Sequence, residues 1–355
     1  MSNPKFQKTP LSFHNEIKKR ISEYFKSKGK ATTGNFKLHF KAILLVTGLL
    51  AIYTHVVFFT PPGAWAVLEC IVLGLVTAAI GFNVMHDGAH GSFSRYKWVN
   101  SAASNFANFL GASQHMWKMK HNVIHHTYTN IHGVDDDIEA RPLLRLCEDQ
   151  PRYKIHKYQH LYFWAAYSML YLYWIFGTDY IKYFSGRIGP TPLRKMTPTE
   201  HISFWFYKLA HAFIFVALPI YMVGFMPWLI GFLSMGLVTG FVLSIVFQLA
   251  HTVEHTHFPH PDEATGKMED EWAIHQVKTT ANFATRNKVV SWLVGGLNFQ
   301  VEHHLFPKIS HVHYPAISKI IKKACEDYGI RYLEYPKVRM AVASHVAFLR
   351  QLGRK

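Results

Sequence analysis

The sequence predicts an all-α membrane protein in which four transmembrane helices form two hairpins beneath a cytoplasmic helical cap. Of its 355 residues, 49% are hydrophobic and 15% aromatic, whereas only 17% are charged. This composition favours a one-domain membrane protein over two soluble domains. The apolar residues are gathered into runs close to the ~20 residues that a helix needs to cross a bilayer. The predicted spans are residues 38–59, 64–83, 204–225 and 228–250.

The N-terminal segment, residues 1–37, is basic and precedes a single membrane domain at 38–355. Its Lys and Arg residues alternate with isolated apolar ones, which predicts an amphipathic helix on the membrane surface. These apolar residues are Phe6, Leu11, Phe13, Ile17, Ile21 and Phe25. The segment has no short apolar core followed by a small-residue cleavage site, so we predict no secretory signal peptide.

Two charge-free turns divide the four spans into hairpins. Pro61-Pro62-Gly63 separates the first two spans, and Met226-Pro227 separates the last two. Glu69, the one carboxylate of the first hairpin, is expected to face the protein interior because contact with lipid would be costly. Pro219 is expected to kink the third helix.

The polar blocks at residues 84–200 and 251–355, like the N-terminal segment, are rich in Lys and Arg. The positive-inside rule therefore places all three basic parts and both termini in the cytoplasm. Residues 161–176 are apolar but too short for a confident span, and their Tyr and Trp content predicts a helix at the membrane interface. An amphipathic basic helix is predicted around Ile317 to Cys325.

The net charge of +16 could indicate nucleic-acid binding, but no nucleic-acid-binding motif accompanies it. Charge flanking a membrane accounts for it more simply, with membrane lipid as the partner. The three cysteines, Cys70, Cys147 and Cys325, are far apart and form no Cys-x-x-Cys pair. The sequence therefore indicates neither a disulfide framework nor a thiolate zinc site.

Three histidine clusters lie in the polar blocks or at their edges. On helices, His86 and His90 would share one face, as would His121 and His125, so that each pair could bind one ion. His126 and His304 each follow another histidine and would point toward a second ion or a second wall of one site. Isolated core or surface histidines remain the alternative, but three clusters in one chain favour a two-metal centre.

Read in order, the clusters resemble the membrane fatty acid desaturase superfamily over roughly residues 37–336. The matching stretches are HDGAHGSFS at 86–94, HNVIHHTYTNIHGVDDDIE at 121–139 and NFQVEHHLFP at 298–307. Gln300 replaces the leading His of the third motif, which is similar to the front-end and related acyl-lipid or acyl-CoA branch. Front-end enzymes often carry a fused cytochrome b5 domain with a His-Pro-Gly-Gly motif. That motif is absent here, which implies a separate electron donor such as ferredoxin or cytochrome b5.

The resemblance implies two iron ions bound almost wholly by histidine. The implied ligands are His86, His90, His121, His125, His126, His251, His303 and His304. His251 is included because it ends the fourth span, where the family places another ligand. Gln300 could bind iron directly or through water, and His255 could substitute for His251.

Carboxylates near the implied ligands could orient their rings. Asp87, Asp135 and Glu302, with Asp136 and Asp137, are candidates to accept the second ring N–H of ligand histidines. A solvated acidic loop is the alternative for Asp136 and Asp137. The remaining histidines, among them His132, His257, His275 and His311, are expected at the surface, beside the ligands or at lipid headgroups.

The implied activity is an O2-dependent desaturase that introduces a cis double bond into a long-chain acyl-CoA, carrier-protein or lipid ester. The chain lacks the His-Glu-x-x-His of metalloproteases and has one Glu-x-x-His, at Glu254 to His257, where soluble di-iron bundles need two. A hydroxylase or ketolase on the same scaffold remains open. A His-rich metal transporter is disfavoured because the clusters fall outside the apolar spans. The missing haem motif slightly favours a bacterial plasma membrane.

Overall fold

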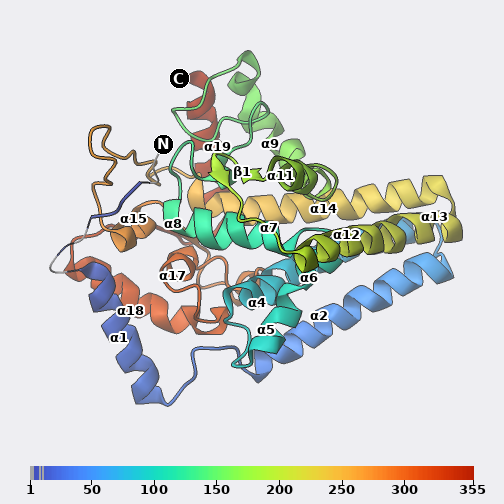
Figure 1. Cartoon of the computed structure of the whole chain (residues 1–355), viewed down its shortest axis with the longest axis horizontal. Coiled ribbons are helices and arrows are strands. Elements are labelled where there is room, and N and C mark those ends of the chain that lie inside the picture. The colour runs from blue at the N-terminus through green and yellow to red at the C-terminus, as the bar shows by residue number, and fades with distance from the viewer. Residues whose placement is uncertain (1–3, 8, 10–11) are drawn as a thin grey trace.

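The computed structural model describes residues 4–7, 9 and 12–355, and it is mostly helical. Long helices extend to one side of the molecule, and shorter helices and loops gather at the other, where both chain ends lie (Figure 1). We call the second part the head, and define it as residues 12–35, 91–197 and 252–355.

Four helical runs are long and apolar enough to cross a membrane, as the sequence predicts: Phe36–Phe59, Gly63–His90, Pro198–Val223 and Phe225–His251. The first three runs contain a π-helical turn. Their elements are α2 (Phe36–Thr54), η1 (His55–Phe59), α3 (Gly63–Ile80), η2 (Gly81–Met85), α4 (His86–His90), α12 (Pro198–Ala212), η7 (Phe213–Ala217), α13 (Leu218–Val223) and α14 (Phe225–His251).

The turn between the last two runs differs from the predicted Met226-Pro227. Gly224 makes the turn, with φ 85° and ψ 165°, and α14 begins directly at Phe225. Pro227 lies in the first turn of α14, where a backbone N–H needs no helical partner and proline is tolerated. The third run also begins earlier than predicted, because Thr197 and Glu200 form a capping box and Pro198 opens the helix.

The head contains many short elements and two small two-stranded sheets, with β1 antiparallel to β2 and β3 parallel to β4. Its helices before the third long run are α1 (Phe13–Lys28), α5 (Lys97–Ser104), α6 (Phe106–Phe109), α7 (Gln114–Lys118), η3 (Met119–His125), α8 (His126–Tyr128), η4 (Asp136–Ile138), η5 (Lys154–Tyr158), α9 (Gln159–Ser168), α10 (Leu170–Tyr173), η6 (Trp174–Thr178) and α11 (Asp179–Ser185). Its later helices are α15 (Trp272–Lys278), α16 (Lys288–Leu293), α17 (Gln300–Leu305), η8 (His311–His313), α18 (Tyr314–Asp327) and α19 (Val338–Arg354). Its strands are β1 (Arg187–Ile188), β2 (Thr191–Pro192), β3 (Asn282–Phe283) and β4 (Glu334–Tyr335).

The predicted N-terminal amphipathic helix forms as α1, but protein covers its apolar face. Phe13, Ile17, Ile21 and Phe25 are all buried in one cluster with residues of α18. Four apolar side chains on one stripe suit a protein groove as well as a membrane surface, so their spacing could not distinguish the two. The expected membrane contact of this face is therefore wrong. Phe6 falls outside this helix, and Leu11 lies outside the described residues.

Glu69 also differs from its prediction. Its side chain is 26% exposed on the flank of the long helices, where the Nδ1 atom of His55 lies 2.8 Å from its carboxylate. A local partner on the neighbouring run therefore replaces burial as the means of satisfying this group.

Small residues let the long helices approach closely. Thr239 of α14 donates a hydrogen bond to the carbonyl oxygen of Gly74 in α3, at 3.1 Å. A methyl group on Gly240 would collide with the carbonyl oxygen of Ser168, at the end of α9, whereas one on Gly48 would meet no atom within 4 Å. These contacts fix α14, whose last residue is His251, against α3 and the head.

We expect Gly240→Ala to lower the thermal stability of the detergent-solubilised protein, because the backbone of Ser168 cannot move aside as a side chain could. Overpacking of this kind costs about 1–3 kcal/mol. Gly48→Ala is the matched control, also in a long helix, and should leave the melting temperature equal or slightly higher. Unfolding can be followed by size-exclusion chromatography after heating. Equal melting temperatures for Gly240→Ala and Gly48→Ala would contradict this packing.

Candidate metal centre

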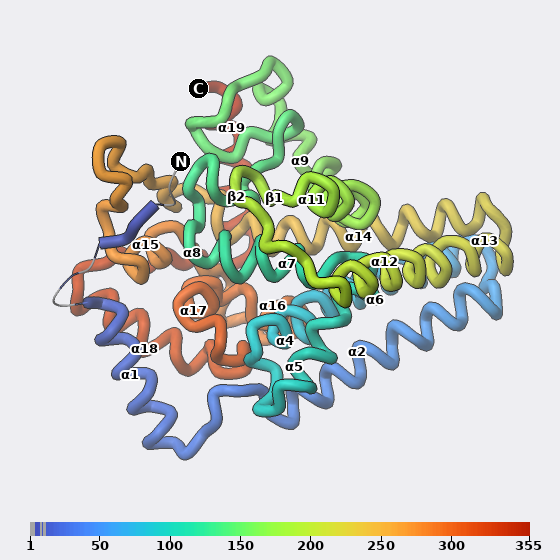
Figure 2. The backbone as a smooth tube through the Cα atoms, in the orientation of Figure 1, coloured from blue at the N-terminus to red at the C-terminus, as the bar shows by residue number. Residues whose placement is uncertain are grey.

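Four separate parts of the chain bring histidines to one place at the head end of the long helices. His86 and His90 lie in α4, and His251 is the last residue of α14. His121 and His125 lie on η3, His126 begins α8, and His303 and His304 lie on α17. Figure 2 shows α4, α8 and α17 near the middle of the molecule, between the long helices and the rest of the head.

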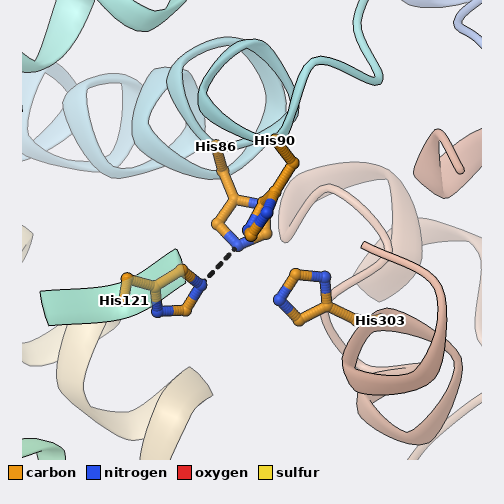
Figure 3. Close-up of side chains that lie close together, drawn as sticks. All are labelled: His86, His90, His121 and His303. Atoms are coloured by element: carbon orange, nitrogen blue, oxygen red, sulfur yellow. Dashed lines mark hydrogen bonds between the residues drawn. The ribbon is translucent and has the colours of Figure 1, made fainter. Parts of the chain in front are cut away.

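The first group consists of His86, His90, His121 and His303, each offering a ring nitrogen within 4.8 Å of the others. Figure 3 shows these rings pointing toward a common space from three different helices. The Nε2 atoms of His86 and His121 are 3.1 Å apart. This spacing suits a shared ligand between the rings.

The second group consists of His125, His251 and His304, again with ring nitrogens within 4.8 Å of one another. His126 forms a similar set with His303 and His304, and its Nε2 atom is 3.3 Å from that of His121. His126 therefore lies between the two groups. The structure thus brings together all eight histidines that the sequence singled out.

His121 and His125 each belong to more than one possible group. His121 lies with His86, His90 and His303, and His125 lies with His251 and His304, but the two also form a set with Asp137. Although residues 119–125 form a π-helix, the rings of His121 and His125 stack with 5.4 Å between their centroids. The two rings therefore lie side by side as expected, and whether they share one ion stays a prediction.

The cluster is buried and rich in unpartnered ring nitrogens. Seven of the eight histidines are at most 5% exposed, and His90 is partly exposed. Among the residues that the structure describes, six fully buried ring nitrogens of the cluster have no hydrogen-bond partner: Nε2 of His90, His125, His251, His303 and His304, and Nδ1 of His126. A buried polar atom without a partner costs about 1–3 kcal/mol. Bound metal ions would satisfy these atoms, so the residues present fit such ions.

In three of the rings whose Nε2 atom has no partner, the other ring nitrogen, Nδ1, contacts a polar group of the protein. The Nδ1 atom of His125 is 3.0 Å from Asp135, and that of His304 is 2.8 Å from Oε1 of Gln276. Nδ1 of His251 faces the carbonyl oxygen of Thr279 at 3.3 Å. A neutral ring that donates through Nδ1 carries its lone pair on Nε2. These contacts therefore leave Nε2 free to bind a metal.

Electrostatics keep most of the cluster neutral. Burial, reinforced by neighbouring imidazoles, lowers the pKa of several of these rings well below the ordinary value, namely His121, His126, His303 and His304. Burial also opposes charge on His125, but Asp135 and Asp137 outweigh it and raise the pKa of that ring. Neutral imidazoles are the form that binds transition metals.

Of the carboxylates expected to orient ligand rings, Asp135 and Asp137 lie 3.0 and 3.4 Å from Nδ1 of His125, whereas Asp87 and Glu302 contact other residues. Asp87 accepts hydrogen bonds from Ser310 at 2.8 Å and from Nδ1 of His311 at 3.0 Å. Glu302 accepts from Asn282 and Tyr332, both at 2.7 Å, and burial raises its pKa to about 7. Each precedes or follows a cluster histidine directly, so its side chain points to another side of the helix.

Gln300 and His255, the other two residues expected near the metal, have different surroundings. Gln300 is fully buried, and neither atom of its side-chain amide has a hydrogen-bond partner within the described part of the chain. His255 is exposed, with φ 74°, and joins none of the histidine groups. Gln300 thus keeps its possible role beside the cluster, whereas the structure does not place His255 there.

Several residues around the cluster were not identified from the sequence. Gln276 and Thr129 contact His304, and the hydroxyl of Tyr314 lies 3.2 Å from Nδ1 of His303. The buried His311, predicted among surface or neighbouring histidines, instead connects Asp87 to Lys41 of α2. Thr129 lies within the second quoted motif, although no pattern there marks its hydroxyl as a histidine contact. Gln276, Tyr314 and His311 lie outside the three motifs, so no local signal could have identified them.

Comparison with known proteins gives a consistent result. The family model for fatty acid desaturases matches residues 37–336. The chain is 35% identical to an sn-1 linoleoyl-lipid 6-desaturase of Arthrospira platensis, over 97% of this chain and 93% of the relative. It is also 35% identical to the enzyme of the same name from Synechocystis, over 96% of this chain and 96% of the relative. An acyl-lipid (8-3)-desaturase of Physcomitrium patens is 35% identical over 98% of this chain and 75% of its own length.

We expect Asp135→Asn to weaken transition-metal binding roughly 10- to 100-fold, because it replaces one of the carboxylate oxygens that hold His125 with a donor. The neighbouring Asp136→Asn is the control, since Asp136 pairs with Lys182 at 2.8 Å. The amount of metal retained per chain can be measured by elemental mass spectrometry after dialysis against increasing concentrations of a chelator. Equal retention in the two variants would show that Asp135 does not orient a metal ligand.

Proposed function

Because this chain belongs to the fatty acid desaturase family, we propose that it is an O2-dependent acyl-lipid desaturase whose buried histidines hold two iron ions. The family and the relatives make it a fatty acyl desaturase, an oxidoreductase of lipid metabolism. The observation that carries the metal assignment is the convergence of unpartnered ring nitrogens from four parts of the chain.

The two histidine groups divide naturally between two ions. His86, His90, His121 and His303 would hold one iron, and His125, His251 and His304 would hold the other. His126 lies where it could bind either ion or bridge the space between them. Gln300, buried with an unpartnered amide, could complete a coordination shell. Imidazole suits iron, zinc and copper alike, so the choice of iron rests on the family.

Bound iron would activate O2 and supply the oxidant that removes hydrogen from two adjacent methylenes, leaving a cis double bond and water. The contribution of this chain is to orient its imidazoles through Asp135, Gln276 and the carbonyl oxygen of Thr279. Burial also excludes water from the reacting centre.

An apolar wall borders the cluster on one side. The ring of Trp117 stacks on His121 with 4.5 Å between centroids, and Phe247 lies 5.7 Å from the same ring. Met85 and Ala107 pack around Trp117. We propose that the acyl chain approaches along this wall, because hydrocarbon needs an apolar surface beside the oxidant.

The names of the relatives favour a lipid ester over a CoA or carrier-protein ester as substrate. Two of them are named for introducing a bond at position 6 of a linoleoyl chain, on the carboxyl side of its existing bonds. We propose the same front-end regiochemistry here.

For the topology, we propose two transmembrane hairpins with the head and both termini in the cytoplasm. Apart from Lys37, Lys41 and Lys208, the four long runs contain no Lys or Arg, and the turns at residues 60–62 and 224 are uncharged. Basic residues therefore gather at the head end, as the positive-inside rule requires of the cytoplasmic side. The two cyanobacterial relatives, matched over 93% and 96% of their lengths, favour a bacterial plasma membrane.

We propose that a separate carrier such as ferredoxin or cytochrome b5 supplies the electrons. Not every basic residue of the middle block is available to such a partner. Lys120 pairs with Asp137 at 2.7 Å, Arg141 pairs with Glu139, and Arg145 is buried. A docking surface would have to use other cations.

Lipids extracted from a host that expresses the protein should contain a new double bond on the carboxyl side of existing ones. Mass spectrometry with double-bond localisation measures its position, and an empty-vector host is the control. Hydroxylated or keto products without a new double bond would overturn the assignment as a desaturase.

His125→Ala should abolish desaturation and lower bound iron while the protein still inserts in the membrane. Loss of this ring removes one proposed ligand, while the backbone N–H groups of Asn130 and Asp137 still hold Asp135 in place. His255→Ala is the matched control, because this exposed histidine lies outside the groups. Normal turnover by His125→Ala, or equal loss in both variants, would contradict the proposed ligand set.

A further inference from the structure

A second group of metal-binding side chains lies outside the central cluster. His132, Cys147 and Asp149 each offer a ligand atom within 4.8 Å of the others. His132 follows the second histidine cluster in the chain, and the other two lie in the loop between η4 and η5. None of the three belongs to the eight histidines described above.

Cys147 is held in a loop that is fixed independently of any metal. The thiol is fully buried. The side-chain oxygen of Gln150 accepts a hydrogen bond from the backbone N–H of Leu146 at 2.8 Å, and its amide donates to the carbonyl oxygen of Ile138 at 2.9 Å. The buried Arg145 donates to the carbonyl oxygen of Gln150 at 2.7 Å. The loop therefore presents the sulfur in one position.

The sulfur of Cys147 needs a bound cation to become a thiolate. Burial raises the pKa of the thiol to about 11, although the backbone N–H groups of Asp149 and Gln150 lower it. A nearby cation would reverse that balance, since a coordinated thiol is deprotonated outright. Two amides facing the sulfur would then stabilise the negative charge.

The other ligands are available. No hydrogen bond to the ring of His132 occurs among the residues that the structure describes, and the ring is partly buried. The carboxylate of Asp149 lies 3.3 Å from Nε2 of His260, which comes from a third loop. His260 is exposed and could provide a fourth ligand.

We propose that His132, Cys147 and Asp149, completed by His260 or water, form a structural site for a divalent metal of the zinc class. Ligand atoms around tetrahedral zinc lie about 3.3–3.8 Å apart, given Zn–S and Zn–N bonds of about 2.3 and 2.1 Å. Because the three atoms lie within 4.8 Å of one another, they must approach by up to about 1.5 Å, a shift that side-chain rotation can supply. Binding forms one metal–sulfur bond and releases the thiol proton to water, with no change in oxidation state.

Such a metal would connect the loop at 145–150 to the turn that carries Asp135. The backbone N–H of Asp135 donates to the carbonyl oxygen of Ile131 at 2.9 Å, so His132 lies inside the turn that positions this carboxylate. Asp135 in turn holds His125. The site would stabilise the support of the central cluster without contributing to it, and its existence does not depend on the proposed function.

Cobalt(II) titration of the purified, iron-loaded full chain in detergent tests the proposal. Thiolate coordination gives an intense sulfur-to-cobalt charge-transfer band in the near ultraviolet, which imidazole ligands alone cannot produce. We expect one such band per chain, displaced by zinc, and its loss in Cys147→Ser. His132→Ala should keep the fold and weaken cobalt binding by roughly tenfold or more.

Cys325→Ser is the matched control, because Cys325 is equally buried but belongs to no metal-binding group. This variant should keep the band, and size-exclusion chromatography shows whether each variant is folded. Absence of the band in the unaltered protein, its persistence in folded Cys147→Ser, its loss in folded Cys325→Ser, or unchanged cobalt affinity in His132→Ala would overturn the site.

Discussion

The constraint on which the rest of the structure depends is that several buried imidazoles face one another, and six of their buried ring nitrogens have no hydrogen-bond partner among the described residues. The approach of Nε2 atoms such as those of His86 and His121, 3.1 Å apart, is stable only if a lone pair meets a proton or a cation. Because unpartnered buried nitrogens are costly, ligand binding at this place would stabilise the folded protein as well as equip it for chemistry. The long helices and the head are both arranged to maintain this convergence.

The polar network around the cluster explains how loops can position it as firmly as helices do. Asn130, with φ 59°, donates through its side chain to the carbonyl oxygens of His251 at 3.0 Å and His257 at 3.1 Å. Its backbone N–H donates to Asp135 at 2.9 Å. One buried residue thus connects the end of α14 to the carboxylate that holds His125. Side-chain to backbone bonds of this kind give irregular segments a single conformation.

Much of this arrangement could be predicted from the sequence, because its signals are local or periodic. The apolar runs predicted the four long helices, and the His motifs predicted which rings converge. Predictions failed where a feature depended on distant partners. The apolar stripe of α1 packs on α18, and Asp87 pairs with His311. Cys147 has its neighbours His132 and Asp149 in space rather than in sequence, so the spacing of the cysteines carries no signal of the site proposed there.

The central claim is that histidines from four parts of the chain bind a pair of iron ions. Iron K-edge X-ray absorption on the purified, iron-loaded protein tests it most directly. The account predicts that nitrogen dominates the first coordination shell of iron and that the outer-shell carbon atoms of imidazole contribute to the scattering. It also predicts a second iron at a distance that the method can detect. A first shell of sulfur, or of oxygen without imidazole scattering, would contradict it.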